Sequence, residues 1–251
     1  MINAVRNIVL SVLNKNNYGY ISPADFNLYA ANAQMEIYED YFNKYNSVIN
    51  NENLRRSGTD YANILKPIAE VLELFANVER TLTQVAVDTN RYYLPSLSTT
   101  GNESFMISNI YCFHPTTNVR LGEAEKVSVG KINLLLNSPL TTPNVSYPSY
   151  TLSQGIVTVY PSTINGVNSI KATYFSYPKT PKWTFTTLTN GEPVFNQSQP
   201  DYQDFELPLE DEYKLAMKIL QYCGISIREQ QVVQYAMIQE QNQQLTGSQQ
   251  Q

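Results

Sequence analysis

The hydrophobic pattern of the first 75 residues is that of helices. Apolar side chains recur three or four residues apart over residues 3–15 and again over residues 22–48, a spacing that places them on one side of a helix. A polar link that contains Gly19 separates the two segments and resembles a helix end followed by a turn. We therefore expect two helices that pack against each other as a hairpin.

The helix over residues 22–48 has a strong start signal. Ser22 is a favourable N-cap, Pro23 suits the first helical turn, and Asp25 lies three residues beyond the cap. Small residues near the centre of its apolar stripe allow close packing against another helix or a neighbouring subunit, while Gln34 and Glu36 are expected off this stripe. The expected stripe consists of Phe26, Ala30, Ala33, Ile37, Tyr41, Tyr45 and Val48.

Residues 77–206 have a different pattern. β-branched and aromatic residues alternate with polar ones in short runs that turn residues divide, which is typical of β structure. The Asn165-Gly166 pair between two of these runs predicts an antiparallel hairpin, and Asn190-Gly191 predicts a second one. A short helix is expected over residues 126–137. The expected strands cover residues 84–93, 104–113, 156–160 and 169–177.

Helical signals return near the C-terminus. Acidic residues 210–212 suit a first helical turn, and apolar residues follow at helical spacing. Gly224 is expected to end this helix, which covers residues 209–223. Ser226, with Glu229 three residues later, is expected to cap a second helix. The glutamine-rich sequence beyond Met237 lacks the apolar residues that would bury it.

Together these patterns predict an α+β protein: a helical bundle formed by the N- and C-terminal helices, with an inserted antiparallel β-rich domain. A chain of 251 residues is long enough to bury a full core, as one domain or as two. The expected parts are residues 1–76, the N-terminal helical part; 77–206, the inserted β-rich domain; 207–240, the C-terminal helices that complete the helical part; and 241–251, a flexible tail.

Composition narrows the function classes. The net charge is −5, and the sequence contains no run of Lys and Arg. Both facts argue against binding nucleic acid through its phosphates. Only 16% of the residues are charged, while tyrosines number 19, so we expect a neutral polar surface suited to protein contacts. Arg6 interrupts the apolar first helix, and we expect neither a signal peptide nor a membrane span.

The sequence holds few groups for chemistry. His114 is the only histidine, and it follows an expected strand with no partner indicated for a Ser-His-Asp or Cys-His site. Cys112 and Cys223 are the only cysteines, and their spacing fits neither a disulfide framework nor a metal site. We therefore expect a protein that is not an enzyme and has no catalytic residues, cofactor or metal.

Several short segments resemble a known family. Taken in order, they look like structural proteins of tailed double-stranded-DNA bacteriophages, and most like virion proteins of crAss-like gut phages from the head-to-tail connector, the adaptor or neck ring. The resemblance extends from Tyr18 to about Tyr235. The segments are residues 18–27 (YGYISPADFN), 33–39 (AQMEIYE), 94–95 (LP), 147–150 (YPSY), 159–161 (VYP), 177–183 (YPKTPKW) and 224–228 (GISIR).

The resemblance implies a function and a location. Proteins of this family have a helical core with an inserted β domain and assemble as a ring, commonly a dodecamer, below the portal protein. The implied function is that of a non-catalytic virion protein that attaches to the portal, extends the DNA channel and connects head to tail, made in the cytoplasm of the bacterial host. Its implied partners are further copies of itself, the portal, downstream tail or ring proteins, and genomic DNA only as it passes; no membrane is involved.

The C-terminal segment is the expected portal-binding element. It combines a modest apolar face with uncharged glutamine donors and acceptors, which suits a groove between subunits. Ordering such a tail costs roughly 1 to 2 kcal/mol per residue in backbone entropy, so we expect it to stay loose until a partner binds. The residues expected to bind are Val232, Val233, Tyr235, Ile238, Gln241 and Gln244.

Two alternatives remain open from the sequence. Within the same class, the protein could form a more distal tail ring. From a different class, a β-rich domain with Trp183 and many tyrosines could be a carbohydrate-binding module of a host-recognition protein, because aromatic faces stack on sugars. The competing interpretation of the C-terminal segment is that its helix only completes the helical core.

Overall fold

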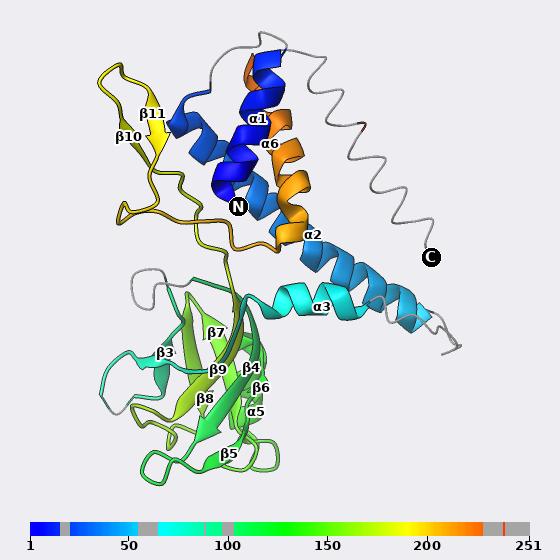
Figure 1. The fold of residues 1–251 in the computed structure, drawn as a ribbon. Helices are drawn as coiled ribbons and strands as arrows, with labels where there is room; N and C mark the ends of the chain where they lie inside the picture. The colour runs from blue at the N-terminus through cyan, green and yellow to red at the C-terminus, as the bar shows by residue number, and fades with distance from the viewer. Residues whose placement is uncertain (16–20, 55–64, 88, 97–102, 228–237, 239–251) are drawn as a thin grey trace. The chain divides into compact units, whose positions relative to one another are not determined.

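The computed structural model describes the chain except for residues 16–20, 55–64, 88, 97–102, 228–237 and 239–251 (Figure 1). The chain divides into two compact units. The helical unit consists of residues 1–71 and 178–251, and the β-rich unit consists of residues 72–177. The protein is therefore α+β, with its N- and C-terminal helices in one unit and two mainly antiparallel sheets in the other.

The helices begin and end close to where their sequence signals lie. The Ser22 hydroxyl accepts a hydrogen bond from the Asp25 N–H at 3.1 Å and donates one to the Asp25 carboxylate at 2.6 Å, which confirms the predicted cap. The following helix continues six residues beyond the predicted end at Val48. The helices are α1 (Ile2–Lys15), α2 (Pro23–Leu54), α3 (Leu65–Glu73), α5 (Val129–Leu136), the 3-10 turn η1 (Leu209–Asp211) and α6 (Glu212–Ile227).

In the helical unit, α6 packs against both α1 and α2 (Figure 1). We expected α1 and α2 to pack mainly against each other as a hairpin. In the described part of the unit each packs mainly against α6, so this prediction is wrong. Gly224 does not end α6 but is buried inside the helix, at a cost of about 1 kcal/mol relative to alanine. Ser226 lies within the same helix, and most of the second helix expected after it falls outside the described residues.

The buried stripe of α2 matches the prediction only in its first half. Phe26, Ala30, Ala33 and Ile37 are buried as expected, but the stripe then continues with Tyr38 and Phe42, whose rings pack edge to face. Tyr41 and Tyr45 are only half-buried, and the side chain of Val48 lies outside the described ones. Gln34, expected off the stripe, is also buried.

The chain returns to the helical unit earlier than predicted. Residues 178–208, which we call the strap, belong to this unit, so the expected boundary at residue 206 is wrong and lies at 177/178. The strap pairs with α2 through polar side chains and not with a sheet. Its own strands form one small hairpin, β10 (Phe185–Thr187) with β11 (Pro193–Phe195). Gly191 in its turn has φ +84°, and the hairpin predicted from Asn190-Gly191 is confirmed.

The β-rich unit contains two sheets. One has the strand order β1-β9-β4-β5 and the other β2-β3-β8-β7-β6. All pairs are antiparallel except β6 with β7. The strands are β1 (Ala76–Thr81), β2 (Thr83–Gln84), β3 (Arg91–Tyr93), β4 (Ser104–Phe113), β5 (Arg120–Glu123), β6 (Glu125–Lys126), β7 (Ser149–Ser153), β8 (Ile156–Tyr160) and β9 (Ile170–Ser176).

One continuous apolar core joins the inward residues of the two sheets. β8 and β9 each alternate buried and half-buried positions, as strands with one face on a core do. Ile132 is the buried residue of α5. Ser128 caps the N-terminus of this helix. The central buried side chains are Leu82, Tyr92, Ile110, Cys112, Tyr150, Val157, Val159, Ile164, Ile170, Ala172 and Tyr174.

Two strand predictions were wrong. β8 and β9 do not pair: each lies in a different sheet, and Asn165-Gly166 belongs to the crossover between them. A Cβ on Gly166 would lie 2.4 Å from the Cβ of Pro115, so the glycine serves close backbone approach and not a hairpin turn. Residues 84–93 are not one strand: they run from the end of β2 through a turn into β3. The Val85 N–H closes this turn by donating to the Arg91 carbonyl at 2.9 Å.

Candidate partner-binding site

Most of the predicted portal-binding residues lie outside the described part of the chain. This holds for Val232, Val233, Tyr235, Gln241 and Gln244. Ile238 is described, and its side chain is 55% exposed. The structure therefore locates the point from which this segment starts, which is the end of α6 at Ile227.

A series of polar contacts fixes α6 against α2. Asp211 is buried and accepts hydrogen bonds from the Tyr41 hydroxyl and the Lys214 ammonium, both at 2.6 Å. Burial, followed by the hydrogen bond to Asp211, raises the pKa of Tyr41 well above its ordinary value. Tyr41 therefore keeps its proton throughout the physiological range, and the contact stays a donor–acceptor pair.

The series continues along both helices. Glu36 accepts from the Lys218 ammonium at 2.7 Å and from the Tyr222 hydroxyl at 2.9 Å, and the Tyr222 ring stacks on Tyr29 at 6.2 Å between centroids. Partners on α2 thus have falling numbers as those on α6 rise, so the two helices run antiparallel. The chain consequently leaves α6 near the start of α2.

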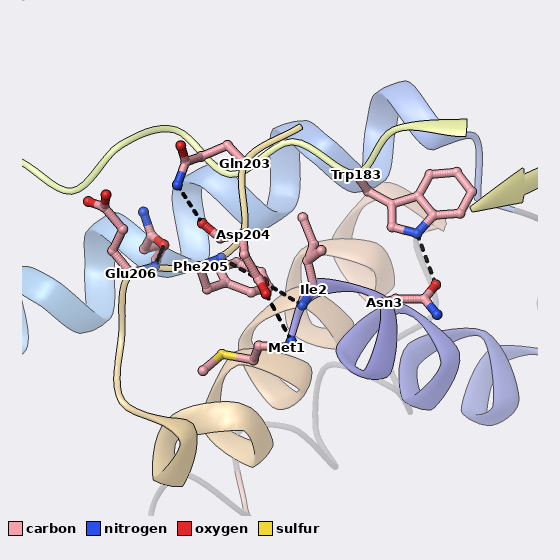
Figure 2. A network of polar contacts seen from close by, with 9 residues as sticks. Met1, Ile2, Asn3, Trp183, Gln203, Asp204, Phe205 and Glu206 are labelled. Atoms are coloured by element: carbon pink, nitrogen blue, oxygen red, sulfur yellow. Dashed lines mark hydrogen bonds and ion pairs between the residues drawn. The ribbon is translucent and has the colours of Figure 1, made fainter. Parts of the chain in front are cut away.

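The strap is attached to the start of α1 by one carboxylate (Figure 2). Asp204 accepts hydrogen bonds from the Met1 ammonium at 3.0 Å and from the Ile2 N–H at 2.7 Å. It also accepts from the Phe205 N–H at 2.8 Å. Burial acts to raise the pKa of Asp204, but the three hydrogen bonds outweigh it and lower the pKa below its ordinary value. The carboxylate is therefore ionised at neutral pH and supplies the acceptor that the first turn of α1 needs.

A second attachment joins the strap to α2. The buried Gln34 amide donates to the Lys179 carbonyl at 2.8 Å and accepts from the Glu206 N–H at 3.1 Å. The Glu206 carboxylate in turn accepts from the Lys179 N–H at 2.8 Å. Both ends of the strap therefore meet at one α2 side chain.

Trp183 anchors the middle of the strap. Its backbone N–H and C=O both bond the Asn27 amide, at 2.8 and 3.1 Å, and its indole N–H donates to Asn3 at 3.1 Å (Figure 2). The buried ring lies under the Arg6 guanidinium at 3.8 Å. Phe185 and Phe195, from the β10–β11 hairpin, stack against it. The base of the hairpin is thereby fixed to α1 and α2.

Beyond this base, the hairpin exposes apolar side chains. Phe185, Leu188 and Val194 are all exposed, and the hairpin is a two-stranded sheet of its own. In the β-rich unit, the most exposed of the large apolar residues is Leu140 on the loop after α5, at 97% exposure. These positions are among the exposed apolar groups that the described surface offers to partners.

The described residues offer little for catalysis. His114 lies in a surface turn, where its Nδ1 accepts from the Thr116 and Thr117 N–H groups at 3.3 Å. Burial raises the pKa of the Cys112 and Cys223 thiols to about 12, so neither is a thiolate at neutral pH. Within the part of the chain that the structure describes, no three His, Cys, Asp or Glu side chains gather as metal ligands, and no helix is long and apolar enough to cross a membrane.

Sequence reasoning missed the polar groups that hold the strap. Asp204 lies 202 residues from Ile2, and Gln34 lies 145 residues from Lys179, and no local pattern pairs positions so far apart. The prolines at 178 and 181 were the available signal, because proline interrupts sheet pairing. Comparison with protein-family profiles and with curated protein sequences finds no match to this chain.

Proposed function

We propose that this protein is a non-catalytic structural subunit of a tailed bacteriophage virion. It forms a ring in the neck, attaches to the portal protein, extends the channel through which the genome is packaged and ejected, and presents a surface to the next tail component. The ring is a dodecamer, as the resemblance to connector proteins implies. Its location is the virion, after synthesis in the bacterial cytoplasm.

The observation that supports this most is where the resembling segments lie. Residues 18–27, 33–39 and 177–183 come from distant parts of the sequence, yet Asn27 bonds Trp183 and Gln34 bonds Lys179. Described residues of the three segments therefore share one packed feature of the helical unit. A helical core shared with connector proteins would bring these residues together in this way.

Ring assembly requires two different faces on each subunit, because a cyclic ring is built from heterologous contacts. The helical unit supplies candidates for both: the projecting β10–β11 hairpin, with exposed Leu188 and Val194, and the exposed Leu28 on α2. The negative charge of the chain suits a channel that DNA traverses without adhering.

Portal attachment is assigned to the segment after Ile227. Val232, Val233, Tyr235 and Ile238 supply its apolar contacts, and Gln241 and Gln244 its hydrogen bonds. One such segment is a weak ligand, but repetition around a ring multiplies its effect, so a few kcal/mol per copy holds the assembly.

The test is binding of purified protein to immobilised portal. Truncation after Ile227 should abolish binding and leave the thermal transition unchanged, and truncation after Gln239 should separate the helix-forming residues from the glutamine tail. The paired change Val232→Asp and Val233→Asp should also abolish binding, whereas the control Leu140→Asp, at an exposed position of the β-rich unit, should not. Undiminished binding by both truncated chains would overturn the assignment.

The two alternatives predict different partners. A more distal tail ring would bind other tail proteins and not the portal. A carbohydrate-binding module would bind glycans as a monomer, but the structure buries Trp183 in the helical unit under Arg6 and between aromatic rings. The tryptophan that favoured the module is therefore not available to stack on a sugar.

A further inference from the structure

A long uncharged part of the β-rich unit carries exposed apolar side chains. Residues 132–170 contain no Asp, Glu, Lys, Arg or His, and Lys131 just before them is the one charged residue of α5. Exposed apolar side chains that gather in one segment mark contact sites for proteins or membranes. The large ones within residues 129–147 are Val129, Leu134, Leu136, Leu140, Val145 and Tyr147.

A hydrogen-bonded turn directly after α5 holds the most exposed of these side chains. The Thr141 and Thr142 N–H groups donate to the Ser138 carbonyl at 3.2 and 3.0 Å. The hydroxyls of the same threonines donate to the Leu135 carbonyl in α5 at 3.2 and 3.3 Å. Leu140 lies between these anchors and is 97% exposed. Because its backbone is already fixed, binding through Leu140 costs little conformational entropy.

A second turn follows at once. The Asn144 side-chain oxygen accepts the Ser146 and Tyr147 N–H groups, both at 2.9 Å. The backbones of Asn144 and Tyr147 also bond each other, at 3.2 and 3.3 Å, and Val145 and Tyr147 are exposed. Asn144 is two residues from Thr142, a reach of at most about 7 Å, so the two turns are neighbours.

The backbone of both turns is largely satisfied from within. Three of residues 138–148 are prolines, which have no N–H. Hydrocarbon cannot complete the hydrogen bonds of a backbone, whereas a protein partner can, so an element that enters lipid must satisfy its own. This property favours a lipid surface over a protein groove. The residues whose N–H groups donate to acceptors within residues 135–147 are Ser138, Thr141, Thr142, Asn144, Ser146 and Tyr147.

We propose that the two turns form a membrane-contact surface, in which Leu140 and Val145 enter the interface of a lipid bilayer. Tyr147 suits the same interface, because its ring is apolar and its hydroxyl is polar. The insertion is shallow and does not span the bilayer. The inference is independent of the proposed function, since the resemblance to connector proteins implies no membrane partner.

The charge balance indicates which lipids are needed. The β-rich unit carries six basic and six acidic residues, so attraction to anionic lipids contributes little. Sedimentation of the full chain with phosphatidylcholine vesicles should therefore show binding. Addition of phosphatidylglycerol or of salt should change the partition coefficient by less than about twofold. Binding that requires phosphatidylglycerol and is lost in salt would overturn the proposal.

A matched pair of leucine variants locates the contact. Leu140→Asp removes an apolar side chain and adds a charge that must be desolvated, so it should lower the partition coefficient roughly a hundredfold. Leu188→Asp makes the same change at an exposed position of the β10–β11 hairpin and should leave it unchanged. Both variants should keep the thermal transition of the unsubstituted chain, because both leucines are exposed. Absent binding by the unsubstituted chain, or equal binding by Leu140→Asp, would contradict the proposal.

Leu140→Trp reports insertion directly. Trp183 is the one native tryptophan and is buried in the helical unit, so vesicles should shift and quench only the new fluorophore. Its emission should move to the blue, and lipids with brominated acyl chains should quench it; unchanged emission would refute insertion. A lower oligomeric state of Leu140→Asp without lipid would instead assign the surface to a second copy of the chain. Portal binding should survive Leu140→Asp, so this proposal and the proposed function fail separately.

Discussion

The two units are held together by different means. In the helical unit, buried or half-buried polar side chains join segments more than 140 residues apart: Asp204 to Met1, Gln34 to Lys179 and Asn27 to Trp183. In the β-rich unit, one apolar cluster fills the space between two sheets. Charge differs too: residues 72–177 carry six basic and six acidic residues, whereas the rest of the chain carries 11 basic and 16 acidic ones.

This difference indicates how the stability of each unit responds to the loss of a side chain. A distributed apolar core loses stability in proportion to what is removed from it, while a structure closed by a few polar contacts depends on each of them. The helical unit is formed by both ends of the chain, so its formation costs the conformational entropy of closing a long loop. The β-rich unit is continuous in sequence and should fold independently of those contacts.

The largest effect is expected from Trp183→Ala. It removes the fully buried ring under Arg6 and the bond to Asn3, which should cost the helical unit about 3–5 kcal/mol. Far-ultraviolet circular dichroism should lose helical signal, and Cys223 should become reactive while Cys112 stays protected. Simultaneous exposure of both thiols would show that the units do not unfold separately.

The matching change in the other unit is Tyr92→Ala. Tyr92 is fully buried in the β-rich core, and its hydroxyl donates to the Gly166 carbonyl at 2.9 Å. The loss of about 3–4 kcal/mol should fall on the β-rich unit alone, so the thiol pattern should reverse, with Cys112 reactive and Cys223 protected. Thiol labelling of both variants under one set of conditions checks the pair.

A smaller effect should follow from Gly166→Ala. The added Cβ would lie 2.4 Å from the Cβ of Pro115 and 2.5 Å from the Ser169 hydroxyl, so the crossover must shift at a cost of about 1–3 kcal/mol. The control is Gly130→Ala in α5, where a Cβ meets nothing within 4 Å and should stabilise the helix by up to about 1 kcal/mol. Denaturant unfolding followed through Cys112 measures both variants. If Gly166→Ala destabilised the β-rich unit no more than Gly130→Ala does, the crossover argument would be refuted.

Gln34→Ala tests the polar attachment of the strap. The Lys179 carbonyl and the Glu206 N–H lose their partner, which should destabilise the helical unit by roughly 1–2 kcal/mol. Lys182→Ala, which removes an exposed ion pair with Asp201, should change stability by less than about 0.5 kcal/mol. Thermal unfolding of the two variants decides whether the α2 attachment matters more than a surface pair on the same strap.

The smallest effect is a dependence on acid. Because hydrogen bonds hold the pKa of Asp204 below its ordinary value, its contribution is fully present above about pH 4 and disappears as pH falls through the lowered native pKa. Cys223 protection should therefore decline below about pH 4 in the unsubstituted chain. In Asp204→Asn the decline should be shallower, and identical acid profiles would contradict the role of this carboxylate.

Local signals predicted much of this fold. The Ser22 cap, the bounds of β4 and β8 and the Asn190-Gly191 hairpin all follow from neighbouring residues. Strand partners did not follow, because pairing of β8 with β7 and of β9 with β4 is decided by the packing of two sheets. The strap was missed for a related reason: its polar partners are distant in sequence, and a buried glutamine is not distinguishable from a surface one by spacing alone.

The candidate site was predictable to a lesser degree. The sequence pointed to the segment after Ile227, and of its named residues only Ile238 is described. The Asp204 site escaped prediction because an aspartate and a chain terminus form no motif. Only the folded structure shows that the Met1 nitrogen lies 3.0 Å from an Asp204 carboxylate oxygen.

Electron microscopy of the full chain mixed with portal protein tests the central claim most directly. The account predicts dodecameric rings of this protein stacked coaxially on the portal, with the same assembly formed by Leu140→Asp and lost on truncation after Ile227. Monomers beside bare portal rings, under conditions in which both unit cores remain closed to thiol reagents, would contradict it.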